Sequence, residues 1–203
     1  MNQKLQKFID QLDVSDITEE RKMVLQHLIE YIKLRKASSR AIILNLICTH
    51  NSRRSHLSQV WAQTMAAFYK VDNVYCYSGG TEATAVYPQV IETLKNQGFD
   101  IQALSDGSNP VYAIKFNTDE PAIIAFSKTF DNKFNAKTNF AAIMTCSHAD
   151  ENCPFISGAD KRIALNYEDP KLFDNTPEQA AKYIERSKQI ATEMKYTFSH
   201  LDD

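Results

Sequence analysis

The chain has 203 residues, of which 43% are hydrophobic and 24% are charged, as in an ordinary globular protein with one substantial core. Its formal net charge of -2 gives no reason to expect nucleic acid or an anionic membrane as a partner. No apolar run approaches the roughly 18 residues of a membrane span, and Met1–Leu12 lacks the apolar block of a signal peptide, so we expect a cytoplasmic protein.

The first 38 residues predict helices. Apolar residues between Leu5 and Leu12 have helical spacing, and a second apolar stripe runs from Met23 to Leu34 behind a capping Asp16 or Thr18. Residues 36–40 are typical of a linker. We therefore expect an N-terminal helical extension over residues 1–38 and an α/β domain over residues 41–203.

From residue 41 onwards, short apolar runs alternate with helical patterns. The predicted elements are strands at 41–47, 74–77, 140–145 and 162–165, helices at 55–69, 84–97 and 177–200, and a hairpin of 111–116 with 122–126. The hairpin belongs to a less regular region that we treat as an insertion at about 109–137. This order predicts an α/β three-layer sandwich with a mainly parallel central sheet.

A loop at the carboxyl end of the first strand carries the strongest chemical signal, Cys48-Thr49-His50-Asn51-Ser52-Arg53-Arg54-Ser55. The N–H groups of such a loop and the start of the next helix favour a bound oxyanion. The same field favours the thiolate form of Cys48, the candidate nucleophile. Arg54 offers a planar fork of donors to two anion oxygens, and Ser55 can hydrogen-bond the thiolate. A buried, inert Cys48 is the alternative interpretation.

Two more cysteines, Cys146 and Cys153, follow the strand at 140–145 in a segment rich in turn-forming residues. We expect an exposed, mobile loop on the same sheet edge as Cys48, and hence a relay of thiol–disulfide exchange. Inert packing of both thiols, or a metal site that includes His148, are the alternatives. Core packing is the better interpretation of Cys76.

A carboxylic acid is needed to protonate the oxygen that leaves when Cys48 attacks an oxyanion. Asp169 precedes Pro170 on a stiffened segment that can project one carboxylate over the loop. A solvated turn is the ordinary interpretation of an isolated Asp-Pro pair. The cysteine loop elsewhere in the chain favours the catalytic one.

Together these segments resemble the thioredoxin-coupled arsenate reductase branch of the low-molecular-weight protein tyrosine phosphatase family. Its loop Cys-Thr-Gly-Asn-Ser-Cys-Arg-Ser matches Cys48 to Ser55, and its distal Cys-Ser-x-Ala-Asp-x-Asn-Cys-Pro segment matches Cys146 to Pro154. Its acid matches Asp169-Pro170, and Tyr-Ser-Ala-Gly matches Tyr77 to Gly80. The resemblance covers roughly residues 42–98 and 140–201 and implies a phosphatase-like fold.

Four positions depart from the pattern of the family. His50 replaces the loop glycine, and Arg53 replaces the second cysteine of the loop. Gln59 stands where some relatives carry a glutamate that helps to bind potassium, so a cation site is not expected. Lys171 stands where small tyrosine phosphatases have a tyrosine, which weakens a phosphotyrosine interpretation.

The resemblance implies reduction of arsenate to arsenite by Cys48, Arg54 and Asp169, without a cofactor or metal. Cys146 and Cys153 would then carry the disulfide to thioredoxin, the expected reductant. The main alternative is a phosphatase that forms a phosphocysteine on Cys48 and does not need the other two cysteines. A third possibility is a binding module without catalysis, with the insertion as its recognition surface.

Overall fold

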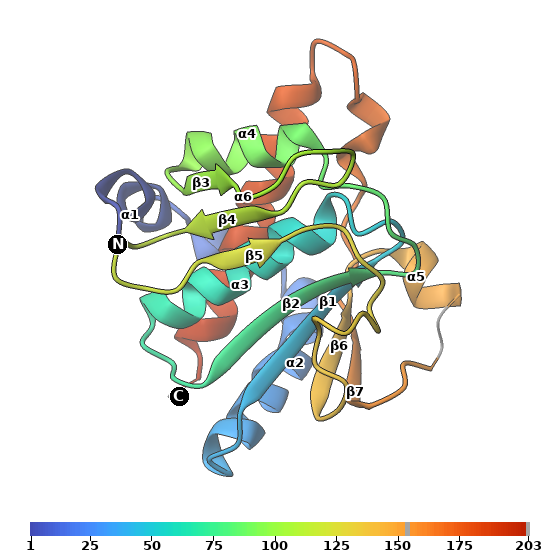
Figure 1. The fold of residues 1–203 in the computed structure, drawn as a ribbon. Helices are drawn as coiled ribbons and strands as arrows, with labels where there is room; N and C mark the ends of the chain where they lie inside the picture. Colours follow the sequence, from blue (N-terminus) through green and yellow to red (C-terminus); the bar gives the residue numbers. More distant parts are fainter. Residues whose placement is uncertain (153–154, 202–203) are drawn as a thin grey trace.

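The computed structural model describes residues 1–152 and 155–201. At its centre lies a four-stranded sheet in the order β2-β1-β6-β7 (Figure 1), and every neighbouring pair is parallel. Its strands are β1 (Ile42–Cys48), β2 (Val74–Gly80), β6 (Phe140–Met144) and β7 (Ala159–Ala164). The predicted α/β class with a mainly parallel sheet is confirmed.

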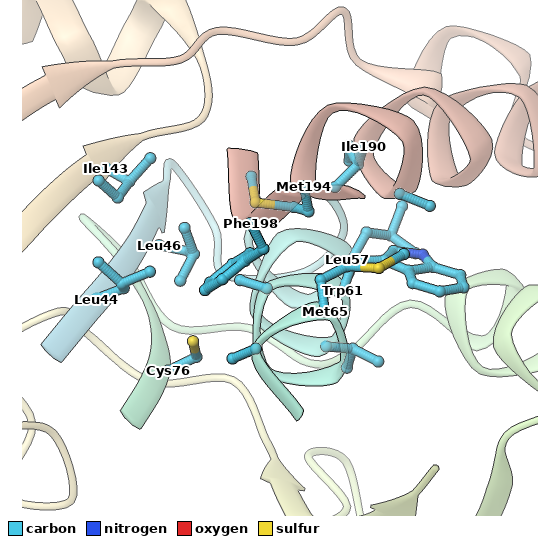
Figure 2. Packing of buried hydrophobic residues seen from close by; sticks show 14 of the residues in the cluster. Leu44, Leu46, Leu57, Trp61, Met65, Cys76, Ile143, Ile190, Met194 and Phe198 are labelled. Carbon is cyan, nitrogen blue, oxygen red and sulfur yellow. The ribbon is translucent and has the colours of Figure 1, made fainter. Parts of the chain in front are cut away.

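Alternate residues of β1 face two different layers. Leu44 and Leu46 face the main core, where Met194 and Phe198 of α6 lie near them (Figure 2). The helices of this side are α2 (Glu19–Ala37), α3 (Arg54–Phe68) and α6 (Gln179–Ser199). On the other face, Ile47 belongs to a smaller cluster that α5 (Ser147–Asn152) and the coil at 126–139 help to form. The three predicted layers are present, and one of them is mostly coil.

The N-terminal segment packs into the main core. Leu5 and Ile9 of α1 (Gln3–Asp10) are fully buried there, as are Leu25 and Leu28 of α2. A short 3-10 turn, η1 (Val14–Asp16), connects the two helices. The predicted helices are confirmed, whereas a domain boundary between residues 38 and 41 stays a prediction.

A second, antiparallel sheet lies over α3 and α4 (Pro88–Gln97), in the strand order β3-β4-β5 (Figure 1). Its strands are β3 (Asp100–Ala103), β4 (Tyr112–Lys115) and β5 (Ile123–Ala125). The predicted hairpin of β4 and β5 is confirmed. Strand β3 was not predicted, because it is four residues long and mostly exposed and so lacks a clear apolar pattern. Its extended conformation is stabilised by antiparallel pairing with β4.

Several element boundaries differ from the prediction. Helix α4 begins at Pro88 instead of residue 84, because residues 81–87 bond the loop after β1, and α6 begins at Gln179, two residues after Pro177. The segment after Cys146 was predicted as an exposed loop, which is wrong for residues 147–152. They form α5, where the N–H of Ala149 donates to the Cys146 sulfur at 3.4 Å.

Candidate active site

The loop after β1 is surrounded by groups that fix its carbonyl oxygens. The carbonyls of residues 48–52 accept hydrogen bonds from Thr81 N, Glu82 N, Thr84 Oγ1, Ser127 Oγ, His56 Nε2 and Tyr87 N. A trans peptide directs its N–H opposite to its carbonyl. Within the part of the chain that the structure describes, the N–H groups of residues 50–53 donate to no acceptor. They form a set of donors that suits an anion.

His50 stands where the resembled family has a loop glycine, but its backbone does not adopt the left-handed conformation that favours glycine. The residue with a left-handed backbone is Asn51, at φ 45°, and asparagine tolerates that region better than most residues. Gly80 leaves the space that the loop needs. A Cβ there would lie 2.7 Å from both Asn51 N and Thr49 O.

The candidate nucleophile Cys48 is nearly buried and lies in a hydrogen-bonded chain. Its sulfur is 3.1 Å from Ser55 Oγ, and Asn51 Nδ2 donates to the same hydroxyl oxygen at 2.8 Å. Because Ser55 accepts from Asn51, its own proton is available to the sulfur. Such a donor stabilises a thiolate.

Arg54 is the first residue of α3, and its guanidinium faces the segment that precedes the predicted acid. Its Nη1 donates to the carbonyl of Tyr167 at 2.9 Å, and its Nη2 forms a 2.6 Å salt bridge with Asp169. Its buried Nε has no hydrogen-bond partner in the described structure. These two contacts use two of the five N–H groups of the guanidinium, so Arg54 keeps donors for an anion while it is paired with Asp169.

Arg53 was predicted to help bind the oxyanion, but its side chain is engaged elsewhere. The guanidinium forms an ion pair with Asp174 and donates to the Tyr183 hydroxyl at 2.6 Å. Only the backbone N–H of Arg53 is left for an anion. Beside the loop, His50, Ser52, Arg53, Tyr87 and Lys171 help to line a hollow of about 300 Å³.

Cys146 lies beside the loop, as the strand order predicts. The residue is 1% exposed, and its sulfur lies 3.5 Å from Thr49 Oγ1, which also lies 3.3 Å from His148 Nδ1. Cys48 and Cys146 belong to one small buried cluster. Cys153, the other predicted relay residue, lies outside the described residues.

Behind the loop lies a buried polar group that the sequence did not reveal. His56 Nε2 donates to the carbonyl of Asn51, and its Nδ1 accepts from Ser78 Oγ at 3.2 Å. Burial lowers the pKa of His56 to about 3, so the ring is neutral. Lys128 donates its backbone N–H to Asn51 Oδ1 and its ammonium to Ser78 Oγ. Ser78 belongs to the segment Tyr77 to Gly80 that resembles the family, whereas no motif in the sequence pointed to His56 or Lys128.

Lys128 is unusual because its ammonium is buried beside the rings of Phe126 and Phe134. Burial lowers its pKa to about 8. Cationic nitrogen over aromatic faces and two long hydrogen bonds offset part of the cost of burial. The segment around Lys128 thus supports the back of the loop.

Two other predicted positions have structural roles. The side chain of Gln59 donates to the carbonyls of Cys76 and Ile124, and so bridges β2 and β5. Cys76 is buried, and burial raises the pKa of its thiol well above the usual range. The described residues contain no group of three or more His, Cys, Asp or Glu side chains that could hold a metal. Among those residues, none of the helices has the length and apolarity to span a membrane.

No family model matches the chain. It is similar to an arsenate reductase of Staphylococcus aureus (strain Newman), at 32% identity over 124 residues, which cover 61% of this chain and 75% of that protein. An arsenate reductase of Halalkalibacterium halodurans is 25% identical over 137 residues, 68% of this chain and 80% of its own length.

Solved structures share the fold. A YwlE mutant from Bacillus subtilis superposes with a TM-score of 0.53 at 14% identity, over 80% of this chain and 100% of that one. A low-molecular-weight phosphotyrosine phosphatase from Vibrio cholerae gives 0.52 at 10% identity, over 78% of this chain and 95% of that one. The phosphatase-like fold that the sequence predicted is confirmed.

Proposed function

Because the chain belongs to the arsenate reductase family, we propose that it reduces arsenate to arsenite through a relay of three cysteines. Arsenate would occupy the loop, held by the N–H groups of residues 50–53 and by Arg54. The Cys48 thiolate attacks arsenic and forms an S–As bond. An oxygen ligand of arsenic leaves as water, with Asp169 as the proton donor.

The second step is the reduction. The Cys146 thiolate attacks the Cys48 sulfur, the S–As bond breaks, and its electron pair stays on arsenic. Arsenic(V) becomes arsenic(III) and leaves as arsenite, while two thiols become a Cys48–Cys146 disulfide. Cys153 then attacks Cys146, which restores Cys48 and leaves a Cys146–Cys153 disulfide that thioredoxin reduces.

The position of Cys146 supports this proposal over simple phosphoester hydrolysis. Thr49, the neighbour of Cys48 in the chain, has its hydroxyl 3.5 Å from the Cys146 sulfur, so a second thiol lies at the edge of the anion loop. Helix α5 begins directly after Cys146, and Ala149 N donates to its sulfur. The Cys146 sulfur is thus held at the loop by contacts with Thr49 and Ala149, in a place from which it can take part in the second step.

A low-molecular-weight phosphatase is the second candidate, and the fold shared with such enzymes favours it. Cys48, Arg54 and Asp169 would form and hydrolyse a phosphocysteine, and Cys146 would have no part. Both activities can coexist, because arsenate and phosphate have nearly the same shape and charge.

The test measures arsenite formation with thioredoxin, thioredoxin reductase and NADPH, and aryl phosphate hydrolysis in parallel. Cys48→Ser should abolish both activities, whereas Cys146→Ser and Cys153→Ser should abolish only arsenate turnover. Cys76→Ser is the matched control, since this thiol packs in the core, away from the loop. Undiminished arsenate turnover in Cys146→Ser or Cys153→Ser would rule out the relay.

A further inference from the structure

Arg53 connects the anion loop to a distant part of the chain. Its Nε donates to the Tyr183 hydroxyl at 2.6 Å and its Nη2 pairs with Asp174. The Tyr183 hydroxyl in turn donates to the other oxygen of Asp174, at 2.6 Å. The guanidinium also lies 4.2 Å from the ring centre of Tyr87, which stacks on Tyr183. These contacts close a ring of three polar groups over an aromatic pair, and we call it the Arg53 clamp.

The Arg53 clamp is largely shielded from water. The side chains of Arg53 and Asp174 are 12% and 13% exposed, and Tyr183 is fully buried. Burial and the bond to Asp174 raise the pKa of Tyr183 far above neutral pH, so the hydroxyl keeps the proton that it donates. A buried ion pair whose hydrogen bonds are satisfied fixes geometry more firmly than an exposed pair, which water and salt weaken.

The Arg53 clamp holds one end of the segment between Asp169 and Asp174. This segment contains only the short 3-10 turn η2 (Pro170–Phe173), in which Leu172 is 83% exposed. Each end is paired with one of two consecutive arginines of the loop, Asp169 with Arg54 and Asp174 with Arg53. Pro170 of the turn is buried, so the segment is held by this packing contact and, at its two ends, by the two ion pairs.

The two ion pairs differ in what an incoming anion does to them. An oxyanion in the loop takes donors of Arg54 and repels the Asp169 carboxylate, so it weakens the Arg54–Asp169 pair. The guanidinium of Arg53 lies against Asp174, Tyr183 and Tyr87 and does not take part in that competition. The Arg53–Asp174 pair therefore holds the segment when the first pair is loosened.

We propose that Arg53 is a positioning residue, which through Asp174 and Tyr183 holds the 169–174 segment so that Asp169 stays over the bound oxyanion. This inference rests on the proposed role of Asp169 as proton donor. It also gives a use to the residue that replaces the second loop cysteine of the resembling family. A planar guanidinium is required, because Nε and Nη2 bond two partners at once and a lysine nitrogen cannot match that fork.

The experiment combines turnover with amide hydrogen exchange. Arg53→Ala should lower kcat roughly tenfold through misplacement of the acid, with the KM for the oxyanion changed less than about twofold. In an Asp169→Asn background, the same change should cause no further loss. Arg53→Lys should not restore kcat, and Tyr183→Phe, which keeps the ring and its stacking, should give a smaller loss.

Exchange provides a readout that needs no activity. Amides of Asp169 and of residues 171–174 should exchange faster in Arg53→Ala and Asp174→Asn, while those of β1 keep their protection. Arg35→Gln is the control, because it breaks an ion pair with Asp160 that does not involve residues 169–174. An equal loss of kcat with and without Asp169, or unchanged exchange of residues 169–174, would overturn the inference. If arsenate is not turned over at all, the proposed function fails, and aryl phosphate hydrolysis and the exchange result still test the clamp.

Discussion

Arg54 and Asp169 form a salt bridge of 2.6 Å at the rim of the anion loop. The cation that would hold the substrate is thus paired with the carboxyl group that would protonate the leaving oxygen. The bridge is partly exposed, since 31% of the Asp169 side chain is accessible. An anion and the carboxylate therefore compete for the same guanidinium, and four predictions follow from this and related contacts.

Removal of the competing charge should separate binding from turnover. Asp169→Asn relieves the repulsion between the carboxylate and the anion, so inorganic phosphate should bind a few times more tightly. The same change removes the proton donor, so kcat for arsenate should fall by about 10²-fold or more. Calorimetry with phosphate and steady-state kinetics check the two halves. Weaker phosphate binding in the variant would contradict the competition.

Ser55 should control the reactivity of Cys48. Ser55→Ala removes the donor at 3.1 Å from the sulfur, so the thiolate is less stabilised. Alkylation of Cys48 by iodoacetamide at pH 7 should slow roughly tenfold, from the loss of one hydrogen bond to a charged group. Ser58→Ala is the matched control, because Ser58 lies one helical turn away and its buried hydroxyl has no partner in the described structure. Equal alkylation rates in all three proteins would refute the role of Ser55.

Gly80 should be essential to the shape of the loop. An added Cβ lies 2.2 Å from Glu82 O and 2.7 Å from Asn51 N, and both are backbone atoms that cannot turn aside. Gly80→Ala should cost about 2 kcal/mol or more of unfolding free energy and weaken phosphate binding. At Gly107 the Cβ meets nothing within 4 Å, and only its φ of 104° adds strain. Urea unfolding of both variants checks the difference, and a similar cost at both sites would disprove the steric argument.

The buried ammonium of Lys128 should lower the free energy of unfolding at neutral pH. Burial brings the pKa of its ammonium from 10.5 to about 8, so the unfolded chain binds more protons between those values. Stability therefore rises with pH through this window, and the penalty is complete below pH 8. Lys128→Met should stabilise the protein at pH 7 by up to about 3 kcal/mol, and the gain should vanish near pH 10.5.

Unfolding by urea at several pH values measures this difference, with Lys161→Met as the control on an exposed strand position. A gain in stability that does not change between pH 7 and pH 10.5 would show that burial of charge is not its cause.

The predictions from sequence were accurate where the signal was local. The loop from Cys48 to Ser55 is contiguous, and the strand before it and the helix after it have clear periodicities. The segment after Cys146 was predicted wrongly, because its polar composition is typical of turns. Burial of Ala149 and the bond from its N–H to the Cys146 sulfur favour the helix, and neither is visible in the composition.

The sequence by itself determined most of the helices and strands and the loop with its thiol and arginine, because each depends on residues close together in the chain. The alternation of strands and helices then indicated a parallel sheet. Only the tertiary structure decided what the side chains of the loop contact. Arg53 meets Tyr183 across 130 positions, Asn51 meets Lys128 across 77, and Thr49 meets Cys146 across 97. Such pairings depend on how distant segments pack, and no local pattern of residues encodes them.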